Sequence, residues 1–272
     1  MTTFDPQAIR DFEYAGWQRA AAHYVSTFAQ ATRGFIEKLL DVARVGSGMR
    51  VLDLACGPGV VATAAAERGA LPVGLDFSSA MIALARADHP GIRFEEGDAE
   101  VLPFAKDAFD AVVSNFGVHH VADPIQALCE AHRVLRPGGR LAFTAWAAPE
   151  ENIAWRLLFD AIAAHGDMAV VKAPPSGGGF RQPEDSLRVL NAVGFTEAEA
   201  RLVRREWRVA TARDLLDGFR RGTARTAALI EAQHAAALPA IEAAITRSVA
   251  AYRRPDGFAI PIVAILASGV RS

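Results

Sequence analysis

The chain has 272 residues, enough for one large α/β domain with a sizeable apolar core. Hydrophobic residues make up 51% of it, but charged or small residues interrupt them before any run reaches the roughly 20 apolar residues of a membrane span. The net charge of −2 and the two cysteines, Cys56 and Cys129, indicate no general attraction to nucleic acid, no disulfide framework and no metal knuckle, so we expect a small-molecule partner and no metal.

The first 16 residues, MTTFDPQAIRDFEYAG, include acidic side chains and lack the apolar segment of a secretory signal, so we expect a cytoplasmic protein. Residues 8–45 predict one or two helices. Their aromatic side chains recur on the same faces and are expected to pack against a sheet; they are Phe12, Tyr14, Trp17, Tyr24, Phe28 and Phe35.

Residues 50–145 alternate β-rich runs with helical stretches, which is typical of a doubly wound parallel sheet. Helices are expected after the first strand, from an N-cap at Ser78, and from Asp123 to a stop at the Pro-Gly-Gly turn of 137–139. The expected strands are 49–55, 71–76, 92–98, 109–115 and 139–146.

The second half of the chain predicts an apolar helix, a loop at 174–179 that could hinge over a pocket, a helix at 184–192 that stops at Gly194, and a strand near 200–209. Residues 211–254 predict a helical lobe with an apolar stripe. A last strand at 258–268 contains Pro261, which fits an edge or bulged position. The apolar stripe of the helical lobe consists of Leu238, Ile241, Ile245, Val249 and Tyr252.

A glycine-containing loop lies where the first strand passes into a helix, in the segment DLACGPG that begins at Asp53. Glycines there let a ligand approach the backbone and leave helix N-terminal amides free to bind it. Gly57, Gly59 and Ala62 also satisfy the pattern G-x-G-x-x-G/A, so a nicotinamide or flavin enzyme is an alternative.

Two acidic residues help to separate these alternatives. Asp76 ends the second strand, where a carboxylate can accept hydrogen bonds from both hydroxyls of an adenosine ribose in either kind of cofactor. Asp53 faces the loop, and a carboxylate about 4 Å from a pyrophosphate would cost roughly 1 to 4 kcal/mol in repulsion. S-adenosylmethionine (SAM) has no phosphate, and its ammonium and sulfonium would be attracted. The charges therefore favour SAM.

A third acid, Asp98, follows the third strand in the segment GDAEVLPF. It could accept a hydrogen bond from an adenine amino group, while Phe77 or Met81 covers the ring. Because open α/β sheets bind ligands at the carboxyl ends of their strands, the three acids are expected to surround one extended ligand.

Three segments together resemble successive motifs of the class I SAM-dependent methyltransferases, in particular the group of ubiquinone and menaquinone biosynthesis C-methyltransferases. They are VLDLACGPGVVATAAAERGALPVGLDFSSAMIALAR, GDAEVLPFAKDAFDAVVSNFGVHHVADP and EAHRVLRPGGRLAFTAW. The resemblance covers residues 35–147, and NAVGFTEAEARL and the closing strand fit the family's sixth and seventh strands.

The resemblance implies an α/β, Rossmann-like sheet of seven mostly parallel strands with helices on both faces and a helical lid or lobe. The implied division is a helical cap (1–46), a SAM-binding core (47–146, 183–209 and 256–272), a lid insertion (147–182) and a helical lobe (210–255).

The same resemblance assigns the cofactor SAM, with S-adenosylhomocysteine as product. It places the methionine moiety near Asp53 and the backbone of Ala55, Gly57 and Gly59. It places the ribose on Asp76, adenine between Phe77 or Met81 and Asp98-Ala99, and the reacting methyl group beside Ser114, Asn115 and Phe116.

Two histidines after the fourth strand, His119 and His120, are candidates for the acceptor side. His119 could act as a general base because imidazole titrates near neutrality, and the alternative is that both rings bond to loop backbone or cap a helix. Other side chains could line the acceptor cavity or simply belong to the core, namely Trp17, Tyr24, His120, Trp146 and Phe180.

Residues 201–225 contain eight arginines against three acidic residues. Such a run is usually a solvated helix face, and the alternative is that Arg220, Arg221 or Arg225 attracts an anionic acceptor or a carrier protein.

The expected function is methyl transfer from SAM to a carbon or oxygen, less readily a nitrogen, of a small and largely apolar molecule. The alternatives are a SAM-binding protein that does not methylate and a nicotinamide-dependent oxidoreductase. DNA or protein methylation is disfavoured because the chain has no Asn-Pro-Pro-Tyr motif and no basic nucleic-acid face. The sequence leaves a homodimer open.

Overall fold

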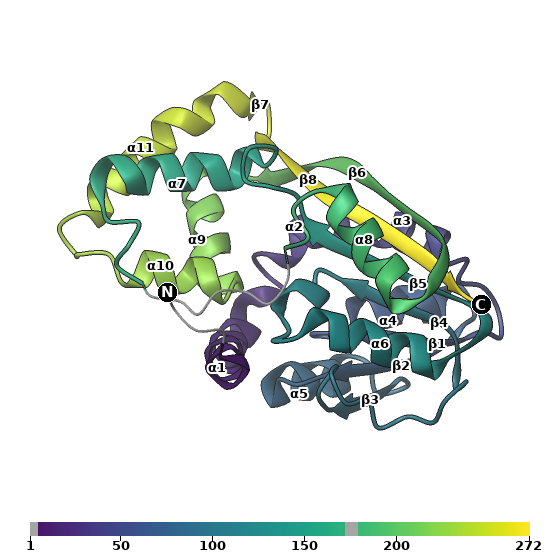
Figure 1. Ribbon diagram of the computed structural model, residues 1–272. Helices are drawn as coiled ribbons and strands as arrows, with labels where there is room; N and C mark the ends of the chain where they lie inside the picture. The colour runs from purple at the N-terminus through teal and green to yellow at the C-terminus, as the bar shows by residue number, and fades with distance from the viewer. Residues whose placement is uncertain (1–4, 172–178) are drawn as a thin grey trace.

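A single mixed sheet organises the computed structural model, which describes residues 5–171 and 179–272 (Figure 1). Its strand order is β3-β2-β1-β4-β5-β8-β6, and the short β7 pairs with β8. The strands are β1 (Arg50–Leu54), β2 (Leu71–Asp76), β3 (Arg93–Glu96), β4 (Phe109–Asn115), β5 (Leu135–Trp146), β6 (Phe195–Val209), β7 (Arg253–Arg254) and β8 (Gly257–Arg271).

The first five strands are parallel, and β8 runs antiparallel between β5 and β6. The expected fold, a sheet of seven mostly parallel strands, is therefore confirmed. The helices are α1 (Pro6–Tyr24), α2 (Ala29–Arg33), α3 (Ile36–Val42), α4 (Val60–Glu67), α5 (Ser79–Asp88), α6 (Pro124–Val134), α7 (Ile153–His165), α8 (Pro183–Val193), α9 (Ala212–Gly222), α10 (Arg225–Glu231) and α11 (Leu238–Val249).

Local sequence signals set several of these boundaries. The Ser78 hydroxyl accepts the Met81 amide at 3.3 Å and caps α5, as predicted. Asp123 caps α6, and Gly194 ends α8 with a φ of 103°, a backbone conformation that favours glycine.

Several boundaries differ from the sequence-based expectation. The N-terminal region forms three helices, and β6 begins earlier, at Phe195. The helix expected at 123–135 ends at Val134, and the turn at 137–139 already lies in the next strand, because Leu135 pairs with Phe109 and the register shifts before the next pair, Ala111 with Arg140. The turn is thus an irregularity within β5.

Pro261 lies in β8, a central strand, at a position where only one neighbouring strand pairs with it. β5 ends at Trp146 opposite Ala264, so Pro261 lies beyond it, paired with Glu206 of β6. The missing amide hydrogen of proline therefore breaks no bond to β5.

Helices cover both faces of the sheet. One apolar cluster joins the sheet to α3, α7, α9 and α11, and a second joins it to α6 and α8. The lobe of α7, α9, α10 and α11 lies at one end of the sheet, above α1 (Figure 1). Its predicted stripe is buried at Ile241, Ile245 and Val249. The predicted hinge at 174–179 falls outside the described residues except for Gly179.

No helix of the described ranges is long and apolar enough to cross a membrane.

Candidate active site

A cavity lies at the carboxyl ends of β1, β2 and β4 and is closed on one side by α1. Most of the predicted site residues meet in it. They are Trp17, Tyr24, Ala55, Gly57, Asp76, Phe77, Met81, Asp98, Ala99, Asn115, Phe116 and His120.

The backbone at the cavity is strained at two positions. Ala55 and Phe116 have φ values of 55° and 61°, in the left-handed region that side chains other than glycine rarely adopt. Both residues line the cavity. Such strain persists only where the surrounding structure enforces it, and it is concentrated at functional sites.

The buried Asp76 carboxylate fixes the loops on either side of it. One oxygen accepts the Gly57 amide at 2.8 Å, and the other accepts the Ser78 amide at 2.9 Å. Burial raises the pKa of Asp76 to about 6, against the opposing effect of these two hydrogen bonds. Asp76 therefore holds the glycine loop and the start of α5 together while facing the cavity.

Asp53 lies beside the main cavity, in a smaller one that also touches Tyr24 and Asn115. Its Oδ2 accepts the Ala62 amide at 2.9 Å, whereas the buried Oδ1 has no hydrogen-bond partner among the described residues. Burial, reinforced by the charge of Asp76, raises the pKa of Asp53 to about 7. An unpartnered buried carboxylate oxygen suits a cationic ligand group.

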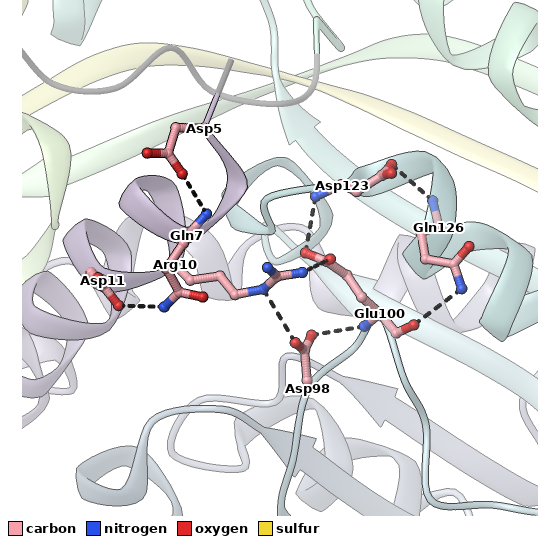
Figure 2. A network of polar contacts seen from close by, with 8 residues as sticks. All are labelled: Asp5, Gln7, Arg10, Asp11, Asp98, Glu100, Asp123 and Gln126. Atoms are coloured by element: carbon pink, nitrogen blue, oxygen red, sulfur yellow. Dashed lines mark hydrogen bonds and ion pairs between the residues drawn. The ribbon is translucent and has the colours of Figure 1, made fainter. Parts of the chain in front are cut away.

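Asp98 lies in a polar network that ties α1 to the turn after β3 (Figure 2). One Asp98 oxygen accepts the Glu100 amide at 2.8 Å, and the other lies 3.4 Å from Arg10 Nε. Arg10 also pairs with Glu100, whose second oxygen accepts the Asp123 amide at 2.9 Å. Arg10 and Glu100 both line the cavity.

His120 is held by a fully buried carboxylate from α1. Its Nδ1 lies 3.0 Å from Glu13 Oε2, which also accepts the Trp17 indole N–H at 3.1 Å. Arg225 of α10 donates to the other Glu13 oxygen. Burial alone would raise the pKa of Glu13, but the charges and hydrogen bonds of His120 and Arg225 bring it below its ordinary value. Glu13 is therefore ionised and joins three elements.

The remaining predicted residues lie outside the main cavity. Gly59 begins α4, and Ser114 is fully buried in β4. Trp146 stacks behind Phe116 at 3.9 Å between ring centroids, and Phe180 packs on Phe143 within the core. His119 has an enclosed Nδ1 without a partner among the described residues. Burial, with the nearby charges of His120 and Arg225, holds the pKa of His119 well below its ordinary value.

Sequence reasoning missed Arg10, Glu13 and Glu100. Glu100 follows Asp98 by two positions and could have been found as part of the same motif. Arg10 and Glu13 lie about one turn apart on an amphipathic helix, where polar residues normally face solvent. No local pattern marks either of them as part of a site.

Known proteins are similar to this chain in sequence and in fold. The family described as "Methyltransferase domain" matches residues 52–143. The chain is 40% identical over 118 residues to a demethylmenaquinone methyltransferase of Renibacterium salmoninarum, in an alignment that covers 43% of this chain and 50% of that relative. It thus spans about half the length of that relative.

A second demethylmenaquinone methyltransferase, from Thermus thermophilus, is 37% identical over 175 residues, with 58% of this chain and 80% of that relative covered. A solved structure of Haemonchus contortus phosphoethanolamine N-methyltransferase 2, in complex with S-adenosylhomocysteine, has a TM-score of 0.55 and 20% identity over 88% of this chain and 52% of that one. At that identity the solved structure supports the fold. The sequence relatives, the sheet order and the cavity at the strand ends agree: the chain belongs to the class I SAM-dependent methyltransferases.

Proposed function

We propose that this protein transfers a methyl group from SAM to a carbon or oxygen atom of a small, largely apolar molecule. The observation that carries the proposal is the cavity at the strand ends, where Asp76, Asp98 and the strained turn at Ala55 meet. This is the edge at which open α/β sheets bind their ligands.

The unpartnered Asp53 Oδ1 supports SAM over a dinucleotide. A cationic ammonium would satisfy this oxygen, whereas a pyrophosphate would be repelled by the Asp53 carboxylate. The residues that would hold SAM are Asp53, Ala55, Gly57 and Gly59 for the methionine end, Asp76 for the ribose, Phe77, Met81, Asp98 and Ala99 for adenine, and Ser114, Asn115 and Phe116 near the methyl group. When bound, SAM supplies an electrophilic methyl group.

The acceptor class follows from the walls of the cavity. Trp17, Phe116, Val121 and Ala122 contribute apolar surface to its lining. The relatives from R. salmoninarum and T. thermophilus are named for a demethylated menaquinone. An aromatic, quinone-like acceptor is consistent with both observations.

The proton acceptor favoured by the geometry is His120. It lines the cavity, and a hydrogen bond from Nδ1–H to the ionised Glu13 would leave the lone pair on Nε2. A base in this position can accept a proton from a phenol-like hydroxyl as the methyl group arrives. His119, the residue proposed from sequence, lies outside the cavity, so the geometry favours its neighbour.

Calorimetric titration of the purified chain with SAM, S-adenosylhomocysteine and NAD(H) tests the cofactor assignment. We expect the first two to bind and NAD(H) not to bind; the reverse result would revive the oxidoreductase alternative. A mass-shift screen of quinols and other phenols with SAM then tests transfer. SAM binding without a methylated product from any such acceptor would favour a SAM-binding protein that does not methylate.

A further inference from the structure

A further cavity, named the second cavity, lies between α1 and the lobe helices α9 and α10, and the arginines and the glutamate that line it are exposed. It is distinct from the cavity at the strand ends, because the two have no lining residue in common. Arg19 and His23 enter it from α1, and Arg220 and Arg221 enter it from the end of α9. Figure 1 shows how the three helices adjoin beside the sheet.

The charges in this second cavity are unbalanced. Arg19, Arg220 and Arg221 form no ion pair with any acidic side chain of the described residues. Glu231 is the one acidic side chain among the described residues that line the cavity. Three guanidinium groups, which are always protonated, therefore face a shared space with a single carboxylate.

The arginines of residues 201–225 lie in different environments in the fold. Arg213 lies within ion-pair distance of Asp217 and Glu242, and Arg225 is bound to Glu13. Arg225 is thus held by Glu13 and does not line the second cavity. Arg220 and Arg221 are directed to the second cavity instead.

Helix-end electrostatics explain only part of this cluster. Cations in the last turn of a helix interact favourably with its negative end, which accounts for Arg220 and Arg221 in α9. His23 lies in the last turn of α1 and has the same explanation, whereas Arg19 lies more than one turn before the end of that helix and does not. A ligand with negative charge would offset the repulsion among them.

We propose that the cavity between α1, α9 and α10 binds a phosphate group, with Arg19, Arg220 and Arg221 as its cationic ligands. The planar guanidinium fork matches two phosphate oxygens, and a dianion balances more than one arginine. Because α1 also closes the first cavity, a bound phosphate would join this helix to the lobe. The phosphate can belong to a dissolved molecule or to a lipid headgroup.

The experiment is calorimetric titration of the full chain with inorganic pyrophosphate at low ionic strength. We expect saturable binding that weakens about tenfold or more in the double variant Arg220→Ala/Arg221→Ala. Glu231→Gln removes the one lining carboxylate and should tighten binding about threefold. The matched control is Arg247→Ala, which removes an exposed arginine from the last turn of α11 outside this cavity.

Co-sedimentation with phosphatidylcholine vesicles, with and without phosphatidic acid, distinguishes the two sources. Binding that needs phosphatidic acid and is lost in the double variant identifies a lipid headgroup, whereas pyrophosphate binding alone identifies a dissolved phosphate. Absence of both kinds of binding would overturn the proposal. So would equal losses in the double variant and Arg247→Ala, with circular dichroism showing that both fold. SAM affinity should stay unchanged throughout, so this test is independent of the proposed function.

Discussion

The sheet edge at β1 and β2 and the helical layer of α1, α9 and α10 hold their functional side chains in different ways. At the edge, Asp53 and Asp76 accept backbone amides that are at most 19 residues away in sequence. In the helical layer, Glu13 binds side chains that are 107 and 212 residues away. The edge is therefore organised by local loops, and the layer depends on tertiary packing.

Substitution of Glu13 is the strongest test of this difference between the sheet edge and the helical layer. Glu13→Ala leaves Arg225 and His120 without their buried carboxylate, and we expect the free energy of unfolding to fall by about 3 to 5 kcal/mol. Urea denaturation measures this loss. Glu13→Gln keeps hydrogen-bonding capacity without the charge and should lose less. A loss under about 1 kcal/mol in the alanine variant would show that the helical layer does not depend on this contact.

At the sheet edge, Asp76→Ala should affect ligand binding. We expect SAM affinity to fall by at least about 1 to 3 kcal/mol, because two hydroxyl contacts and the anchor of the glycine loop are lost together. Calorimetry measures this loss, and Asp88→Ala, at the exposed end of α5, is the control. Unchanged SAM affinity in a correctly folded Asp76→Ala protein would remove the ribose assignment.

The two regions also differ in how far they could be predicted from the sequence. The bounds of β2 and β4 and the Ser78 cap follow from local patterns, and the structure confirms them. Glu13 could not be predicted, because helical periodicity indicates which face is buried but not which distant partner it meets.

The choice between His119 and His120 could not be predicted from the sequence either, although the two residues are adjacent. His119 and His120 lie in a short 3₁₀ helix, and only His120 lines the main cavity. Their ring centroids lie 4.2 Å apart, yet only one ring reaches the cavity, so a choice between them needs the three-dimensional geometry.

A pH experiment sharpens the comparison at Asp53. Its pKa is raised to about 7 in the ligand-free fold, so this fold holds a proton that the unfolded chain loses at lower pH. The contribution to stability is therefore present at low pH and is lost as the pH rises through about 7. A cationic ligand favours the carboxylate, so SAM binding should release a proton.

SAM affinity should then rise by up to about tenfold per pH unit between roughly pH 5 and 7. Calorimetry in buffers of different ionisation enthalpy measures the released proton, and Asp53→Asn should reduce the release near pH 7, where Asp76, with a pKa of about 6, is largely ionised. If Asp53→Asn releases as many protons as the unaltered chain, the proton comes from another group, and Asp53 is not the residue that meets the ammonium.

The smallest expected effect is at Arg10, where the two regions meet. Its side chain is partly exposed, so Arg10→Ala should lower SAM affinity by only about 0.5 to 1 kcal/mol, through the loss of its contacts to Asp98 and Glu100. Calorimetry measures the change, with Arg10→Lys as the conservative variant and Asp11→Ala, an exposed position of the same helix, as the control. A loss as large as that of Asp76→Ala would mean that α1 holds the cofactor as directly as the sheet edge does. The division between a local cofactor edge and a long-range helical layer would then not hold.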